Sequence, residues 1–140
     1  MLMFETDARM TQPLALAALS PDETQLLWCL RRLAMMAPLG SARCQAVHVA
    51  LQRNFGDAGM GIEHILRCLL VGLARRASRR LGIATPGCAL LTGDEAGLLA
   101  LFAAPSPSAL VAFAGASAAP LLPLCDALRA LIDERQRPLA

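Results

Sequence analysis

The apolar residues of this chain constrain its fold most, because nearly all of them are aliphatic. Hydrophobic residues make up 56% of the 140 residues but aromatic residues only 4%, and Trp28 is the single tryptophan. Any core must therefore be built from Leu, Ala, Val, Ile and Met. Leu and Ala are strong helix formers, whereas the β-branched and aromatic residues that favour strands are few. The composition predicts an all-α protein and excludes a disordered chain.

Helix-start and helix-stop signals divide the chain into five or six helices. Ser20-Pro21-Asp22-Glu23 and Thr92-Gly93-Asp94-Glu95 each place a hydroxyl residue three positions before a glutamate, the pattern of a capping box. The expected helices are one from Ser20 to a stop at Pro38 and Gly40, then 41–54 with Ser41 as N-cap, 62–81 closed by Gly82, 92–102, a buried helix at 108–118, and 121–134. We expect a compact single-domain bundle over residues 1–140, with loosely ordered ends at 1–19 and 135–140.

Apolar residues at helical spacing predict which side of each helix faces the core. The expected stripes are Leu26, Cys29, Leu30 and Leu33 in the first helix, Cys44, Val47, Leu51 and Phe55 in the second, Ile62, Leu66, Leu69 and Leu73 in the third, and Leu121, Leu124, Leu128 and Leu131 in the last.

Charge and cysteine usage favour a cytoplasmic bacterial protein. All 13 basic residues are arginine, which together with frequent Ala, Gly and Pro is typical of a GC-rich genome. The net charge of +2 is too small to indicate a nucleic-acid partner by itself. Five cysteines without disulfide-type spacing, and no secretory signal, indicate reduced thiols.

A membrane span is not expected, although residues 96–125 carry no charge. Prolines interrupt this stretch, and its longest proline-free part, 108–119, would extend only about 18 Å as a helix. The hydrocarbon layer of a bilayer is about 30 Å thick.

The sharpest chemical pattern is a mirrored pair of metal-ligand residues, Cys44-x3-His48 and His64-x3-Cys68. Residues four apart share one helix face, and Cys and His are preferred zinc ligands, so two helices folded back on each other could form a Cys2His2 site. However, the helical wheel places His64 and Cys68 nearly opposite the leucine stripe of their helix. We favour the interpretation that no metal binds here, with two buried free cysteines and two surface or hydrogen-bonded histidines.

A second candidate is an interaction surface on the first helix, opposite its apolar stripe. Trp28, Arg31, Arg32 and Met35 combine apolar side chains with two charges, and exposed Trp and Met are enriched in protein interfaces. The competing interpretation is a further packing contact within the bundle.

Arg75, Arg76, Arg79 and Arg80 form a third candidate, since four guanidinium groups within two helical turns could contact an anion or an acidic partner. A solvated helix end is the favoured explanation, because cations complement the C-terminal end of a helix dipole. The glycine connector Gly56–Gly61 follows a helix and lacks the ending of a phosphate loop, so we expect a turn there.

Catalysis finds little support in the sequence. The acidic residues gather where helices are expected to begin, which capping explains without chemistry: Asp22, Glu23, Glu63, Asp94 and Glu95. We therefore expect that the protein is not an enzyme and binds no cofactor. We expect an interaction or accessory module that also self-associates, with a homodimer as the expected form. The alternatives are a structural zinc or metal-sensing protein, and a binder of small hydrophobic ligands lined by Met35, Met36 and Met60.

Overall fold

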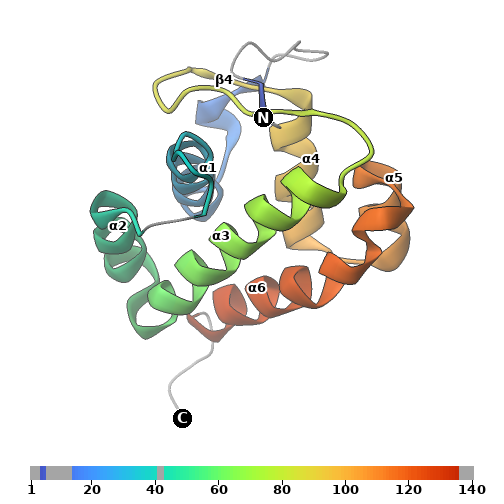
Figure 1. The fold of residues 1–140 in the computed structure, drawn as a ribbon. Coiled ribbons are helices and arrows are strands. Elements are labelled where there is room, and N and C mark those ends of the chain that lie inside the picture. Colours follow the sequence, from blue (N-terminus) through green and yellow to red (C-terminus); the bar gives the residue numbers. More distant parts are fainter. Residues whose placement is uncertain (1–3, 6–13, 41–42, 136–140) are drawn as a thin grey trace.

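In the computed structural model, which describes residues 4–5, 14–40 and 43–135, the chain forms a helical bundle (Figure 1). The α-helices of the described residues are α1 (Pro21–Ala34), α2 (Gln45–Phe55), α3 (Gly59–Arg76), α4 (Gly93–Ala103), α5 (Pro107–Ala114) and α6 (Leu122–Arg135). Short 3-10 helices are η1 (Leu16–Ala18), η2 (Gly56–Ala58) and η3 (Ala116–Leu121). The expectation of an all-α bundle of five or six helices is confirmed.

Helix α3 crosses the middle of the molecule and packs against α1, α2 and α6 (Figure 1). Its expected stripe is buried, and Ile65 and Leu70 extend it, so α3 buries more of its circumference than a surface helix. At its start, Gly59 lies against the α2 backbone, where an added Cβ would come within 2.7 Å of the Leu51 carbonyl. The lack of a side chain at Gly59 therefore allows the start of α3 to approach the α2 backbone closely.

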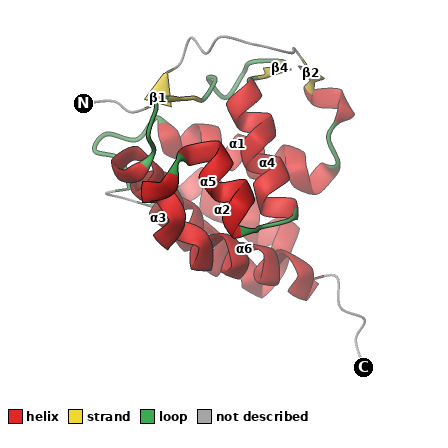
Figure 2. Ribbon diagram, turned by 90° about the vertical axis from the view of Figure 1, so that its right-hand side faces the viewer, coloured by secondary structure: helices red, strands yellow, loops and turns green. Residues whose placement is uncertain are grey.

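Two pairs of very short strands gather at one end of the bundle (Figure 2). Strand β1 (Phe4–Glu5) pairs in parallel with β3 (Leu81–Gly82), and β2 (Leu14–Ala15) pairs antiparallel with β4 (Leu90–Leu91). The expected extension of the third helix to Leu81, closed by Gly82, is wrong. The helix ends at Arg76 because the next residues bond elsewhere: the N–H of Ser78 donates to the Ala114 carbonyl, and the N–H of Gly82 donates to Asp94.

Further helix boundaries differ from the expectation, and α3 begins at Gly59, inside the glycine connector where a turn was expected. Helix α2 begins at Gln45 with Cys44 as its N-cap residue, and Ser41 lies outside the described residues. Helix α5 ends at Ala114 because Gly115 has a φ of 95°, which favours glycine. The segment expected as a buried helix is only partly buried, with Val111 38% exposed. Its uniform apolarity gave no indication of which side would pack.

Both expected capping boxes are present. The Ser20 hydroxyl accepts from the Glu23 N–H at 3.2 Å, and the Ser20 N–H donates to Glu23 Oε1 at 3.0 Å. The Thr92 hydroxyl accepts from the Glu95 N–H at 3.0 Å, and the Thr92 N–H donates to Glu95 Oε1 at 2.9 Å. These reciprocal bonds satisfy N–H groups that the first turn of a helix leaves without partners.

Arg31 is buried, which corrects its expected place on an exposed interaction surface. Its side chain is 1% exposed and forms a bidentate ion pair with Glu95, with Nε–Oε2 at 2.7 Å and Nη2–Oε1 at 2.9 Å. The same guanidinium donates to the carbonyls of Cys88 and Leu90. Arg31 therefore ties α1 to α4 and to the segment between β3 and β4.

Candidate functional site

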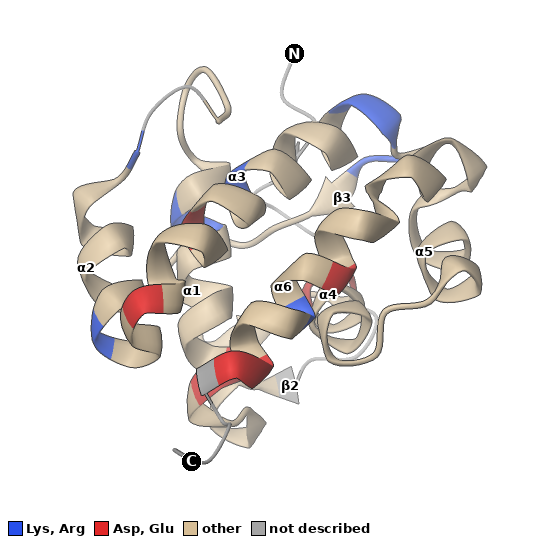
Figure 3. Cartoon of the chain, turned by 90° about the horizontal axis from the view of Figure 1, so that it is seen from below, with Lys and Arg blue, Asp and Glu red and all other residues tan. Residues whose placement is uncertain are grey.

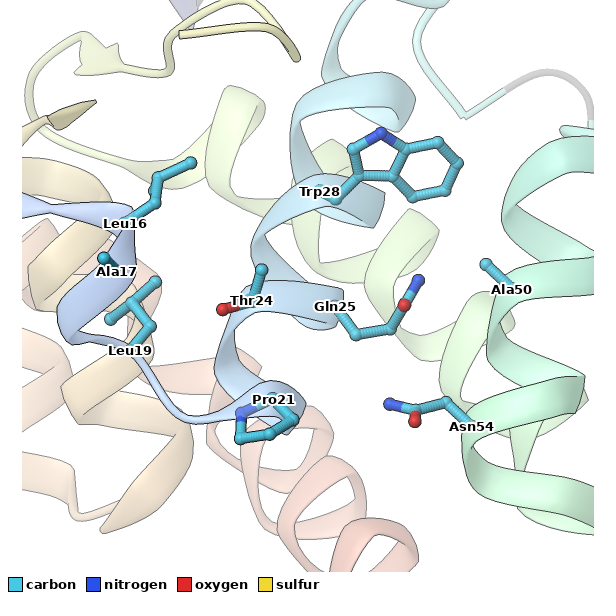
Figure 4. A pocket seen from close by; sticks show the side chains of 9 residues that line it. All are labelled: Leu16, Ala17, Leu19, Pro21, Thr24, Gln25, Trp28, Ala50 and Asn54. Carbon is cyan, nitrogen blue, oxygen red and sulfur yellow. The ribbon is translucent and has the colours of Figure 1, made fainter. Parts of the chain in front are cut away.

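A groove of about 760 Å³ runs over the outer face of α1 (Figure 4). Its lining is mainly apolar and comes from three elements: Leu16, Ala17 and Leu19 near η1, Pro21, Thr24, Gln25 and Trp28 on α1, and Ala50 and Asn54 on α2. In the close view, α1 forms the floor, and the side chains of η1 and α2 stand on either side. This arrangement leaves a hollowed, apolar surface on the bundle.

Trp28 dominates this groove. Its ring is half-buried, and the Arg32 guanidinium carbon lies 5.3 Å from the ring centroid, within the range of a cation–π contact. Met35, the residue that directly follows α1, is 58% exposed. Three of the four residues expected to form an interaction surface thus lie together on the outer side of α1, and Arg31 points inward instead.

The charges around the groove are basic. Among the residues that the structure describes, no aspartate or glutamate lines the groove. Asp22 and Glu23 border a different hollow, next to Leu26 and Leu99. The exposed Arg32 lies over the ring of the groove residue Trp28. An acidic occupant would therefore meet favourable charge.

A polar cluster lies where the start of α2 faces α3. Glu63 is 1% exposed, and its Oε1 lies 3.3 Å from Arg43 Nη2 and 3.4 Å from His48 Nδ1. Its Oε2 is buried and makes no hydrogen bond. Glu63 was expected to mark a helix start, but α3 begins four residues earlier at Gly59, so the carboxylate sits past the first turn and inside the protein. No pattern in the sequence indicates this placement.

The proposed Cys2His2 ligands do not come together. His64 Nε2 lies 3.7 Å from Cys68 Sγ on the outer side of α3, whereas His48 faces Arg43 and Glu63. Among the residues that the structure describes, no three His, Cys, Asp or Glu side chains are placed to hold one metal ion. The phase difference on α3 explains this, since its leucine stripe faces the core.

Basic residues lie in the last turn of α3 and directly after it (Figure 3). Arg75 and Arg76 lie in the last turn, but Arg79 and Arg80 follow the helix end. Arg79 pairs with Asp94 at 2.8 Å, and its guanidinium carbon lies 5.3 Å from the Phe113 ring centroid. The expectation that all four arginines lie on one helix is therefore wrong, and their contact with an anion or an acidic partner stays a prediction.

The methionines proposed to line a ligand cavity are also separated. Met60 borders a hollow of about 500 Å³ that includes Arg43, Glu63 and Arg67. Met35 instead follows the end of α1, where it is exposed.

Among the described residues, no helix combines the length and apolar character that crossing a bilayer requires. No protein-family model matches the chain, and no curated protein or solved structure matches it either.

Proposed function

We propose that this chain is a protein-interaction module whose α1 groove binds an amphipathic, acidic helix of a partner protein. The observation that carries the proposal is the half-buried Trp28 ring in a mainly apolar groove. Aromatic side chains in such hollows are frequent anchors of protein interfaces, because they contribute large apolar area with little loss of conformational entropy.

A helical occupant suits the length of this surface. Thr24, Trp28 and Met35 lie on one side of α1, and Pro21 to Met35 spans about 21 Å along a helix axis. A partner helix of about four turns would cover that distance and place an apolar side chain every third or fourth residue over it.

The basic surroundings select an acidic partner over a second copy of this chain. Docking two α1 faces against each other would bring both Arg32 side chains toward one interface. Like charges in a partly desolvated interface cost free energy, whereas carboxylates flanking an apolar stripe would pair with them. The sequence composition led us to expect self-association, and a second copy of the chain in this groove is therefore the competing outcome.

The test uses two fluorescently labelled amphipathic peptides with one shared Leu stripe, one flanked by glutamates and one by lysines. We expect saturable binding of the acidic peptide by anisotropy, weakened by added salt, and at least tenfold weaker binding of the basic one. Trp28→Ala should reduce the affinity for the acidic peptide about tenfold or more, as for an interface hot spot. Met60→Ala removes an exposed apolar side chain from the other hollow and should change nothing.

Equal affinity for both peptides would contradict the charge argument. If neither peptide binds and sedimentation shows a dimer that Trp28→Ala converts to monomer, a second copy fills the groove and the acidic-partner proposal is wrong.

A further inference from the structure

The hollow of about 500 Å³ beside the first half of α3 contains a buried carboxylate that is only partly hydrogen-bonded. Glu63 lines this hollow although it is 1% exposed. Its Oε1 lies 3.3 Å from Arg43 Nη2 and 3.4 Å from His48 Nδ1, whereas its Oε2 is buried and has no hydrogen-bond partner. A buried acceptor without a partner costs free energy, and most buried polar atoms in proteins have one.

A second polar atom of the same hollow also lacks a partner. Arg67 lies one helical turn after Glu63 on α3, and its Nε is buried without a hydrogen bond. Residues four apart share a helix face, with Cβ atoms about 5–6 Å apart. One acceptor and one donor therefore lie close together on α3, and neither is hydrogen-bonded to any residue that the structure describes.

The charges that line the hollow are balanced. Arg43 and Arg67 are positive, and Asp57 and Glu63 are negative. A ligand without net charge suits such a surface, provided that each of its own charges meets one of opposite sign. An ammonium group would donate to Glu63 Oε2, and a carboxylate would accept from Arg67 Nε. The two groups together describe a small zwitterion.

The apolar edge and the size of the hollow indicate the rest of the ligand. Met60 lines the hollow and is 61% exposed, and a methionine side chain adapts its shape to apolar groups. The volume lies within the range of about 300–1,000 Å³ that is typical of small-molecule sites. An α-amino acid with an aliphatic side chain carries both charged groups on one carbon and offers an apolar group to Met60.

Access to the Glu63 carboxylate passes Arg43. The Arg43 side chain is 51% exposed and lies against Glu63 Oε1. Exposed side chains change rotamer within picoseconds to nanoseconds, so Arg43 can turn outward and let an ammonium group reach the buried oxygen.

We propose that Glu63 and Arg67 form a binding site for a free α-amino acid with an aliphatic side chain, whose ammonium group binds Glu63 and whose carboxylate binds Arg67. The proposal is independent of what the α1 groove binds.

The test titrates the full ¹⁵N-labelled chain with leucine and with two analogues, and follows backbone amide shifts by NMR. The first analogue, 4-methylpentanoate, lacks the ammonium group, and the second, isopentylamine, lacks the carboxylate. We expect saturable shifts with leucine at the residues that line the hollow. Each analogue should bind at least about tenfold more weakly, because it leaves one of the two buried polar atoms without a partner.

Arg67→Gln tests the carboxylate contact in a variant that should fold, since Arg67 is only partly buried. It should weaken leucine binding about tenfold or more and leave the binding of isopentylamine unchanged, because that analogue has no group for Arg67. Arg75→Gln removes the same charge from an exposed position on α3 outside the hollow, and should leave the affinity for leucine unchanged.

Two results would overturn the proposal in the unmodified chain: no saturable shifts with leucine, or equal affinities for leucine and 4-methylpentanoate. A folded Arg67→Gln variant that binds leucine as tightly as the unmodified chain would also overturn it.

Discussion

The capping boxes at the starts of α1 and α4 have the same local hydrogen bonds but different surroundings. Glu23 is partly exposed and closes its box with the Ser20 N–H. Glu95 is 0% exposed and accepts, in addition to the Thr92 N–H, two N–H groups of Arg31 and the N–H of Ala84. One sequence pattern therefore serves as a helix end at α1 and as the centre of a buried network at α4.

The two boxes should therefore differ in the free energy lost when their glutamate is removed. A cap lost at the protein surface is replaced by water, at a cost of about 1 kcal/mol. A buried ion pair that loses one partner leaves the other charge in a poorly polarisable interior, at a cost of about 3–5 kcal/mol. The α4 box should consequently determine stability far more than the α1 box.

The largest expected effect is that of Glu95→Gln, which keeps the shape of the side chain but leaves the Arg31 charge uncompensated. We expect the free energy of unfolding in urea, followed by circular dichroism, to fall by about 3–5 kcal/mol. Glu23→Gln, the same change in the other box, should cost less than about 1 kcal/mol because the amide oxygen still accepts from the Ser20 N–H. Equal losses in the two variants would refute the contrast drawn between the boxes.

The hydroxyl residues of the two boxes should differ in the same direction, by a smaller amount. Thr92 is 2% exposed, and its Oγ1 also donates to the Gly82 carbonyl at 2.6 Å. Thr92→Ala would leave two buried polar groups, the Gly82 carbonyl and the Glu95 N–H, without their hydrogen bonds to Thr92. It should lower the free energy of unfolding by about 2–3 kcal/mol, against about 1 kcal/mol for Ser20→Ala at the exposed box. Thr92→Ser, which keeps the hydroxyl, is the control and should recover most of the loss in the same urea titration.

Local sequence patterns predicted both boxes, the apolar stripes of α1 and α3 and the all-α class, because these depend on residues within one or two helical turns. The stripe expected for α6 is only partly confirmed, since Cys125 and Ile132 are buried whereas Leu124 and Leu131 are only partly buried. They could not predict the role of Arg31, whose ion-pair partner lies 64 residues further along the chain. A helical wheel represents one helix without its neighbours, so it predicted that Arg31 lies beside Trp28 on the exposed side. The end of α3 was missed for a related reason, since tertiary hydrogen bonds of Ser78 and Gly82 determine it.

The candidate groove was predictable only in part. Trp28, Arg32 and Met35 follow from helical spacing on α1, whereas the walls at Leu16 and Ala50 depend on how η1 and α2 pack. The environment of Cys44 shows the same limit. The spacing of Cys44 and His48 is a mirror image of that of His64 and Cys68, and only the structure separates a cysteine at a helix start from one inside a helix.

The smallest effect should come from an ion pair that resembles the Arg31–Glu95 pair in chemistry but lies at the surface. Arg129 pairs with Asp133, four residues on along α6, at 2.8 Å. Asp133 is 54% exposed, so water screens the charges and the side chains lose entropy when they pair. Asp133→Asn should therefore lower the free energy of unfolding by no more than about 0.5 kcal/mol, and less in 1 M salt, where screening is stronger. A loss approaching that of Glu95→Gln would mean that burial is not what separates the two pairs.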